Sequence, residues 1–197
     1  MDSSSSKSME FHPLIPERWN DLEKLFGKHG ATGGCWCMWW RQTRAEFSRQ
    51  HGESNWTAFK AIVESGIIPG LLAYSDREPV GWCAVEPRKS YPALDRSKTL
   101  ARVDDEPVWS VPCFYIAKHF RYRGLMRDLL TAAINWAGRH GALIVEAYPL
   151  ETKYKLHDSS IYTGVVPVFR EAGFIEVLRR SQRQPIMRKT IGENHAH

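Results

Sequence analysis

Residues 114–127 join an apolar run to a helix through a basic turn that contains Gly124. The turn is crowded by four basic residues: Lys118, Arg121, Arg123 and Arg127. The first turn of a helix has N–H groups without internal partners, and its dipole adds partial positive charge, so such an end binds phosphate. Gly124 lets a ligand approach the backbone because it has no side chain. The segment predicts a site for an anion such as a pyrophosphate, although spacing alone fits a solvated helix start equally well.

The elements on either side must hold this turn in place. Residues 108–117 are an apolar strand candidate, although Pro112 in the middle requires that the ladder be interrupted there. Residues 124–141 form the clearest helix, with apolar positions at helical spacing. Residues 142–148 are an apolar run broken only by Glu146, typical of a strand inside a sheet with a parallel neighbour. This strand–helix–strand unit must cross over right-handed if its strands are parallel.

The remaining elements complete the prediction of an α/β (α+β) fold, a mixed sheet with helices on both faces. The expected strands are residues 9–14, 71–74, 80–85, 174–179 and 185–189, with 71–85 as a hairpin. The expected helices are residues 16–26, 43–52, 55–65 and 165–172, and residues 89–105 read as a loop. Thr43 and Glu46 form a capping box at the start of the second helix. We expect one domain over residues 9–190, with a disordered lead at 1–8 and a flexible tail at 191–197.

The composition narrows the classes of function. The 197 residues carry 27 Lys and Arg against 22 Asp and Glu, a net charge of +5 that suits an anionic cofactor or weak attraction to nucleic acid. No nucleic-acid-binding signature accompanies this charge, so no specific nucleic-acid partner is expected. No apolar run reaches the roughly 18 residues of a membrane span, and the N-terminus lacks the features of a secretory signal. We therefore expect no membrane partner, free thiols at the four cysteines, and a cytoplasmic protein.

The turn matches neither the P-loop pattern nor the dinucleotide fingerprint G-x-G-x-x-G. Residues 121–126, Arg-Tyr-Arg-Gly-Leu-Met, instead resemble the Q/R-x-x-G-x-G/A motif of the GNAT superfamily of N-acetyltransferases, which also lies between an apolar strand and an amphipathic helix. Met126 departs from the motif, which has Gly or Ala there. Residues 142–148 and 165–174 resemble the strand and short helix that follow in the family. The resemblance covers residues 9–190, and residues 145–149 and 162–164 are similar to a bacterial branch.

The resemblance implies a GNAT-like, mostly antiparallel sheet in which a central parallel pair splays apart and acetyl-CoA is the cofactor. The pantetheine arm would lie in the gap and bond to the backbone of Phe114 and Ile116. The pyrophosphate would lie on the N–H groups of residues 122–127, and the amine would enter from the opposite side. The implied cofactor-binding residues are Phe114, Tyr115, Ile116, Arg121, Tyr122, Arg123, Gly124, Leu125, Met126 and Arg127.

Acetyl transfer to an amine needs a base, because the attacking amine must be neutral, and a donor for the developing oxyanion. The strand N–H near Cys113 or Phe114 is the oxyanion candidate. Glu146 is charged within an apolar strand, so it is either a base with a raised pKa or a carboxylate paired with an arginine. Glu86, at the end of the hairpin, is a second candidate for the base or a surface residue. Either carboxylate could act through water.

The proton donor to the leaving thiolate is a separate question. Many GNAT enzymes use a Tyr in the short helix, but this sequence has Phe169 there, so that role is missing or moved. Tyr162, Tyr148 and Tyr115 are the tyrosines in reach by sequence, and the thiolate can also leave unprotonated. Cys113 could form an acetyl-Cys intermediate, although a free Cys in an apolar strand is usually an inert hydrophobe.

Cys35 and Cys37 stand in an aromatic stretch that runs to Trp40. Two ligands do not close a metal site, and no spaced pair completes one, so no metal is expected. Trp36, Trp39 and Trp40 are most simply core residues, or they line a pocket that holds a cationic amine against their ring faces.

The sequence therefore predicts direct transfer of an acetyl group from acetyl-CoA to a primary amine, on a small molecule or on a protein. A non-catalytic acyl-CoA-binding sensor is the alternative. The acceptor cannot be identified from the sequence, and the oligomeric state is open, a homodimer included.

Overall fold

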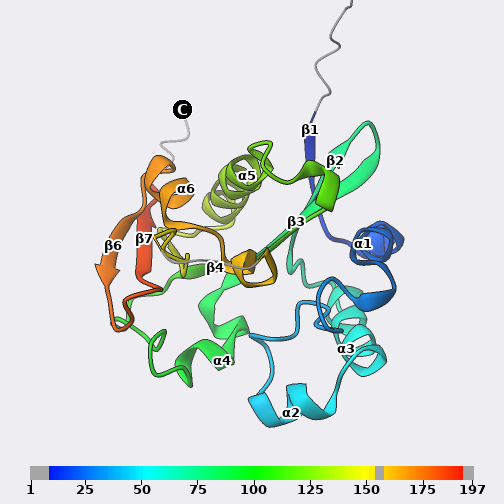
Figure 1. Cartoon of the computed structure of the whole chain (residues 1–197), viewed down its shortest axis with the longest axis horizontal. Helices are drawn as coiled ribbons and strands as arrows, with labels where there is room; N and C mark the ends of the chain where they lie inside the picture. Colours follow the sequence, from blue (N-terminus) through cyan, green and yellow to red (C-terminus); the bar gives the residue numbers. More distant parts are fainter. Residues whose placement is uncertain (1–8, 154–157, 193–197) are drawn as a thin grey trace, which may run out of the picture.

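A computed structural model describes residues 9–153 and 158–192 of the chain (Figure 1). In this part of the chain, seven strands form one mixed sheet in the order β1-β2-β3-β4-β5-β7-β6. Their bounds are β1 Met9–Pro13, β2 Gly70–Ser75, β3 Glu78–Pro87, β4 Trp109–Ile116, β5 Ile144–Ala147, β6 Ile175–Leu178 and β7 Ile186–Thr190. Neighbouring strands are antiparallel except β4 and β5, which run parallel. The mixed, mostly antiparallel sheet expected from the sequence is confirmed.

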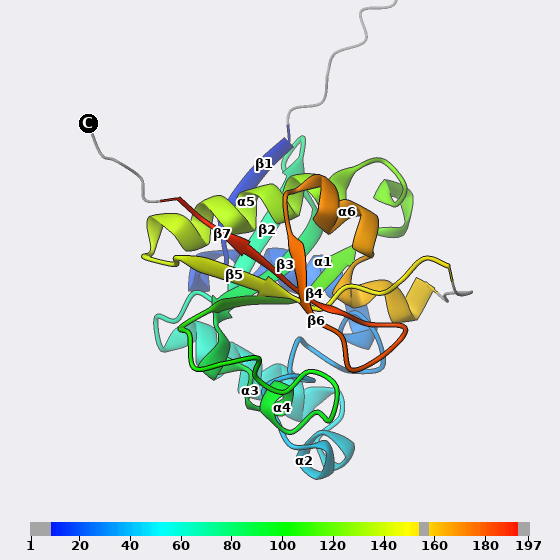
Figure 2. The ribbon, with the colours of Figure 1, turned by 90° about the vertical axis from the view of Figure 1, so that its left-hand side faces the viewer.

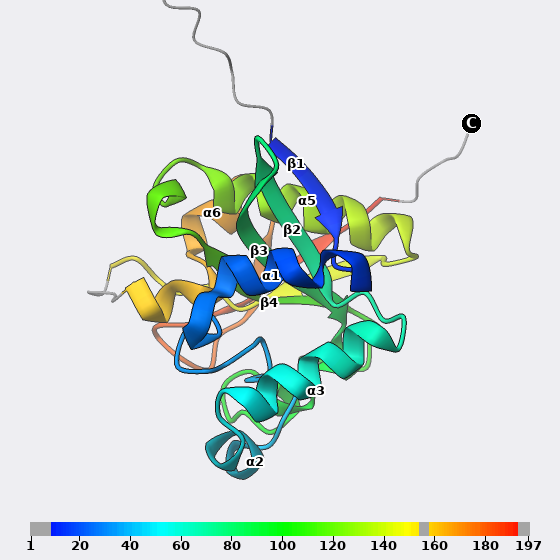
Figure 3. The same ribbon diagram turned by 90° about the vertical axis from the view of Figure 1, so that its right-hand side faces the viewer.

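Helices cover both faces of this sheet (Figures 2 and 3). The α-helices are α1 Trp19–Phe26, α2 Arg44–Arg49, α3 Glu53–Glu64, α4 Pro92–Asp95, α5 Leu125–Arg139 and α6 Val166–Glu171. Short 3₁₀ helices are η1 Pro16–Arg18, η2 Gly27–His29, η3 Arg88–Ser90, η4 Lys118–Phe120 and η5 Asp158–Thr163. Within the described residues, no helix has the length and apolar character needed to span a bilayer.

Each face of the sheet has its own hydrophobic core. On one face, α5 and α6 pack through residues such as Leu129, Ala133 and Phe169. On the other, α1 and α3 pack together with Trp36 and Trp82. Fully burying a large apolar side chain stabilises a fold by roughly 1.5–3 kcal/mol, so these two cores fix the sheet between its helices.

Most predicted elements are present, with three informative details. The predicted capping box at Thr43 forms: Glu46 N–H donates to Thr43 Oγ1 (3.1 Å) and Thr43 N–H donates to Glu46 Oε2 (2.7 Å). The predicted loop at residues 89–105 contains the short helix α4, which begins at Pro92, a favoured first position of a helix. Ile191, assigned to the tail, donates its N–H to the Leu143 carbonyl (2.8 Å). The rest of the predicted tail, residues 193–197, and the predicted lead at 1–8 lie outside the described residues.

Pro112 lies where β4 leaves β5. The parallel pairing runs over three partners, Trp109 with Val145, Ser110 with Glu146 and Val111 with Ala147, and stops there although β4 continues. Proline has no N–H to donate to a ladder. The register of β4 against β3 also shifts beside this residue, between Ala84 and Glu86. The sequence expectation of a ladder interrupted at Pro112 is therefore confirmed, and the two central strands diverge beyond it.

A buried polar row crosses the sheet just before this divergence. Glu86, Ser110, Glu146 and Arg188 stand opposite one another on β3, β4, β5 and β7. The Glu146 carboxylate accepts hydrogen bonds from Arg188 Nε (2.8 Å), Arg88 Nη1 (2.5 Å) and the Tyr148 hydroxyl (2.7 Å). A buried charge is tolerated when it is paired and hydrogen-bonded in this way.

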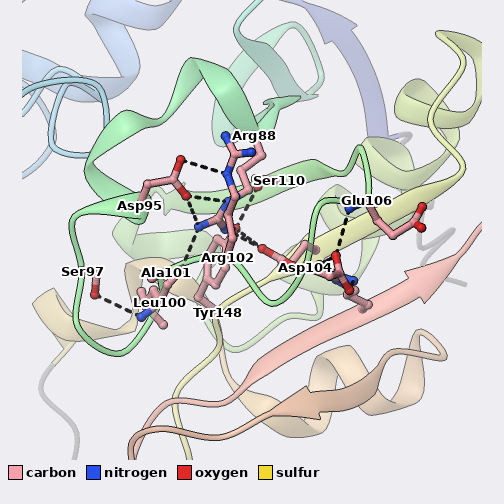
Figure 4. A network of polar contacts seen from close by, with 12 residues as sticks. Arg88, Asp95, Ser97, Leu100, Ala101, Arg102, Asp104, Glu106, Ser110 and Tyr148 are labelled. Carbon is pink, nitrogen blue, oxygen red and sulfur yellow. Dashed lines mark hydrogen bonds and ion pairs between the residues drawn. The ribbon is translucent and has the colours of Figure 1, made fainter.

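Arg88 ties the 88–106 loop to the sheet, and Figure 4 shows its contacts. The guanidinium donates to Asp95 Oδ1 (2.9 and 3.2 Å), to the Leu100 carbonyl (2.8 Å) and to the Tyr148 hydroxyl (2.6 Å). Burial raises the pKa of Tyr148 well above its ordinary value, so the phenol stays protonated and can donate to Glu146. The Ser110 hydroxyl of β4 lies 2.9 Å from the Tyr148 hydroxyl, so this network links β4 to β5 at the end where they are paired.

Glu146→Gln tests this network. The substitution leaves the Arg88 and Arg188 guanidinium groups buried without their shared carboxylate, so we expect a loss of about 3 kcal/mol or more in the free energy of unfolding. Urea denaturation with matched m-values measures it. The control is Glu64→Gln, which removes an exposed i,i+4 pair with Lys60 and should cost less than about 1 kcal/mol. Equal effects of the two substitutions would contradict the structural role of Glu146.

Candidate active site

A cavity of about 810 Å³ runs along the opened part of β4. One end is formed by the start of α5, from Gly124 to Arg127. Its middle is the free length of β4, from Cys113 to Ile116, facing Tyr162 of η5. The other end is lined by aromatic residues of the 31–47 segment. The cavity therefore connects the predicted anion site with the aromatic stretch around Trp39 and Trp40, for which the sequence allowed either a core or an acceptor pocket.

The α5 end has the backbone geometry of an anion site. Tyr122 and Gly124 adopt positive φ angles of 61° and 84°. A positive φ is uncommon for a bulky residue, and local strain of this kind concentrates at functional sites. Tyr122 is 90% exposed, so burial of its side chain does not account for this backbone conformation. The N–H groups at the start of α5, with the helix dipole behind them, face the cavity end.

Two of the four basic side chains of the turn reach the cavity. Arg121 and Arg127 line it, and Arg127 also pairs with Glu171 of α6 (2.7 Å). Both side chains of that ion pair are exposed to solvent, so the pair is weak. Arg127 can therefore leave Glu171 and pair with a phosphate instead. Lys118 and Arg123 do not belong to the lining, and the Arg123 guanidinium lies 5.7 Å from the Phe120 ring.

Fewer backbone N–H groups of residues 122–127 are available to bind a phosphate in the structure than the sequence predicted. Arg127 N–H donates to the Gly124 carbonyl (2.9 Å), so it serves the helix itself. Leu125 and Met126, ahead of it, remain within the cavity lining. Met126, the departure from the motif, places its sulfur toward Gly164, since a Cβ on that glycine would lie 3.5 Å from it. The long side chain is thus directed toward the 161–164 turn and keeps its backbone in the lining.

Phe114 and Ile116 present their backbone to the opened side of β4. Ala117 N–H donates to Val80 of β3 (2.9 Å), and successive residues of a strand alternate in the side to which their backbone groups point. Phe114 and Ile116 therefore face away from β3, toward the gap. The Ile116 carbonyl accepts from Arg121 Nε (3.2 Å), and the Pro112 carbonyl accepts from Trp40 Nε1 (3.2 Å).

The two carboxylates named from the sequence lie outside this cavity. Glu146 is fully buried and both of its oxygens are paired with arginines, which is the structural alternative weighed for it. Glu86 is also buried, not a surface residue, and its carboxylate pairs with Arg41. Neither belongs to the cavity lining. The geometry therefore gives no support to either as a base in direct contact with an amine.

Tyr162 and Cys113 both line the cavity, and they lie close enough to interact electrostatically. Burial, and next the nearby Cys113 and Cys35 thiols, raises the pKa of Tyr162 above its ordinary value. Its phenol is therefore protonated at neutral pH and able to donate. A hydrogen bond with Cys37, and then burial, raise the pKa of Cys113 well above its ordinary value. Cys113 is thus a neutral thiol, which disfavours it as a nucleophile.

Phe169, at the position of the family's tyrosine, is a core residue. It is fully buried, and its ring packs edge-on against Phe114 (6.1 Å between ring centroids) and Phe174 (5.2 Å). The other two tyrosines named from sequence are also placed: Tyr148 is held in the Glu146 network, and Tyr115 lines the cavity. Tyr162 also lines the cavity, close to Cys113.

The tryptophans of the aromatic stretch at residues 35–40 lie partly in the hydrophobic core and partly in the cavity lining. Trp36 is buried and stacks on Trp19 (6.2 Å), as expected of a core residue. Trp39 and Trp40 line the cavity instead, together with Phe47 of α2. Sequence reasoning missed Phe47, although one signal was present: Phe47 is the large apolar side chain of the mostly polar segment Arg-Ala-Glu-Phe-Ser-Arg that follows the capping box. Among the described residues, no group of three or more His, Cys, Asp or Glu side chains could hold a metal.

Comparisons with known proteins agree with this geometry. Residues 35–156 match the model of the acetyltransferase (GNAT) family. An acetyltransferase of the GNAT family from Listeria monocytogenes has a TM-score of 0.60 at 9% identity, with 96% of this chain and 99% of that chain covered. An N-acetyltransferase from Thermoplasma acidophilum, solved in complex with coenzyme A, has a TM-score of 0.53 at 12% identity, with 93% and 99% covered.

A further solved structure and the curated proteins complete the comparison. A GNAT-family protein from Desulfovibrio desulfuricans has a TM-score of 0.52 at 13% identity, with 93% of this chain and 99% of that chain covered. No curated protein matches the chain. The solved structures share the fold, and none of the comparisons assigns a bacterial branch. Because the family model spans more than half of the sequence and includes the turn at Gly124, the chain belongs to the GNAT family of acetyltransferases.

Proposed function

We propose that this protein transfers an acetyl group from acetyl-CoA to a primary amine by direct attack of the amine on the thioester. The observation that carries the proposal is the end of β4–β5 pairing at Val111, which opens a cavity from β4 to the first turn of α5. An extended thioester carrier with a diphosphate fits both features. The Thermoplasma neighbour, which was solved with coenzyme A, supports this assignment.

In the proposed complex, the diphosphate lies on the N–H groups of Gly124 to Met126, with Arg121 and Arg127 beside it. The backbone of Phe114 and Ile116 holds the arm of the cofactor along the gap. Acetyl-CoA supplies the acetyl group as an activated thioester. Its carbonyl then lies near Cys113, where the Phe114 N–H stabilises the oxyanion that forms as the amine attacks.

Bond formation between the amine nitrogen and the acetyl carbon breaks the carbon–sulfur bond. Tyr162 donates a proton to the departing sulfur, in the role that Phe169 cannot perform. No Asp, Glu or His belongs to the described lining of the cavity, so the amine reacts as its neutral form and loses its second proton to water. Cys113 lies beside the reacting centre and takes no covalent part.

The second candidate is an acyl-CoA-binding sensor without catalysis. The absence of a carboxylate or imidazole from the described lining, together with Phe169, favours it. Release of free CoA from acetyl-CoA in the presence of a panel of amines separates the two. Amine-dependent release establishes the enzyme, and tight CoA binding without release with any amine establishes the sensor.

Gly124→Val tests the anion site. A Cβ at Gly124 meets no atom of the described residues within 4 Å, so we expect its effect on folding to be backbone strain of roughly 1–2 kcal/mol. We expect CoA affinity, measured by calorimetry, to fall at least about tenfold, because the side chain obstructs close approach to the helix start.

Gly141→Val is the matched control, because Gly141 follows the other end of α5 with φ 85° and equally open space. It should lose similar stability and keep its CoA affinity. Equal affinity of the two variants for CoA would place the diphosphate elsewhere.

Tyr162→Phe tests the proton donor. We expect kcat to fall about 100-fold, at the lower end of what general acid catalysis contributes, with CoA affinity unchanged. Because the pKa of Tyr162 is raised, wild-type kcat should show no alkaline decline up to pH 9. Tyr115→Phe, in the same cavity, should leave kcat within a few-fold; a larger loss there than at Tyr162 would transfer the role to Tyr115.

A further inference from the structure

Beyond Cys113, the cavity continues into a chamber that acetyl-CoA, placed as proposed above, does not fill. We define the aromatic chamber by Trp39, Trp40, Phe47 and Tyr162, all of which line the cavity. Their rings form a contiguous wall: the centroids of Trp39 and Phe47 are 4.9 Å apart, those of Trp39 and Trp40 are 6.3 Å apart, and those of Trp40 and Tyr162 are 6.5 Å apart. The wall ends at Tyr162, beside the reacting centre.

This wall is held in place by the structure. Trp40 is fixed to β4 by its hydrogen bond to the Pro112 carbonyl (3.2 Å). Phe47 is the buried residue of α2, whose start is fixed by the Thr43 capping box. The chamber is therefore preformed, which lowers the cost of binding a ligand whose shape matches it.

The distribution of charge in the cavity is one-sided. The formally charged side chains of its described lining are Arg121 and Arg127, and both lie at the α5 end. The aromatic chamber carries no carboxylate among the described residues. The buried acid Glu86 is paired with Arg41 and does not belong to the lining. A second ammonium group on an acceptor would lose its water here without gaining an ion-pair partner.

We infer that the acceptor is a small monoamine carried on an aromatic or similarly flat apolar group, with no second charge. This inference rests on the proposed function and names its substrate class. The flat group stacks against Trp39 and Phe47, while the nitrogen points toward Cys113 and Tyr162. Polyamines, aminoglycosides and basic peptide termini need carboxylates that the described wall does not provide.

The test compares matched amines on the full chain at saturating acetyl-CoA. The probes are 2-phenylethylamine, 1,5-diaminopentane and phenylalanine, which share a primary amine and differ in a ring, a second ammonium or a carboxylate. We expect kcat/KM for 2-phenylethylamine to exceed the other two by at least about 30-fold, because both competitors would bury an unpaired charge. A diamine, an aminoglycoside or a basic peptide as the best acceptor would overturn the inference and leave the proposed function standing.

A substitution that supplies the missing charge sharpens the test. Phe47→Glu places a carboxylate in the chamber, so the preference for 2-phenylethylamine over 1,5-diaminopentane should fall at least about tenfold. Phe120→Glu is the matched control, since Phe120 lines the opposite end of the same cavity. Phe120→Glu should change the KM for acetyl-CoA. It should leave the ratio of kcat/KM between the two amines unchanged. An unchanged ratio in folded Phe47→Glu would contradict the chamber as the acceptor site.

A milder variant covers the case in which Phe47→Glu does not fold. Trp39→Leu keeps an apolar wall and removes a stacking surface, so KM for 2-phenylethylamine should rise at least about fivefold with KM for acetyl-CoA unchanged. If instead phenylacetyl-CoA is a better donor than acetyl-CoA and loses its advantage in Trp39→Leu, the chamber holds the acyl group, which overturns the inference. CoA binding without turnover of any amine would overturn the proposed function itself.

Discussion

The loss of strand pairing at Pro112 is the constraint on which the rest of the molecule depends. A parallel pair in the middle of a sheet is normally buried and continuous. Here β4 and β5 share three pairs of residues, and β4 then continues with β3 as its strand partner. The groups that face away from β3 at Phe114 and Ile116 can then serve a ligand instead of a neighbouring strand. The cavity, its anion site and its aromatic chamber are all arranged along the part of β4 that has no pairing with β5.

An opened sheet must be braced, because unpaired backbone groups in a protein interior are costly. Two side chains satisfy carbonyls at the ends of the open edge, Trp40 at Pro112 and Arg121 at Ile116. Just before the opening, the Glu146 carboxylate joins the sheet to Arg88 and Arg188. The charged network thus stabilises the paired end. In the proposed function, the aromatic part of the cavity leaves the chemistry at the open end to Tyr162 and the backbone.

Local patterns predicted the parts of this arrangement that local physics determines. The helix start at Gly124, the interruption at Pro112 and the Thr43 capping box each depend on a few adjacent residues, and each is present. The partners of Glu146 could not be read in this way, because Arg88 and Arg188 are 58 and 42 residues away along the chain. The same limit explains Phe47, whose role depends on where α2 packs. Periodicity predicts which side chains are apolar, but tertiary packing decides which of them line a cavity.

A crystal structure of the protein with bound CoA tests the central claim most directly. We expect a pantetheine arm hydrogen-bonded to the backbone of Phe114 and Ile116, and a diphosphate on the N–H groups of Gly124 to Met126. The aromatic chamber should remain open beyond the sulfur. A β4–β5 ladder that continues past Val111, or CoA bound away from the first turn of α5, would contradict it.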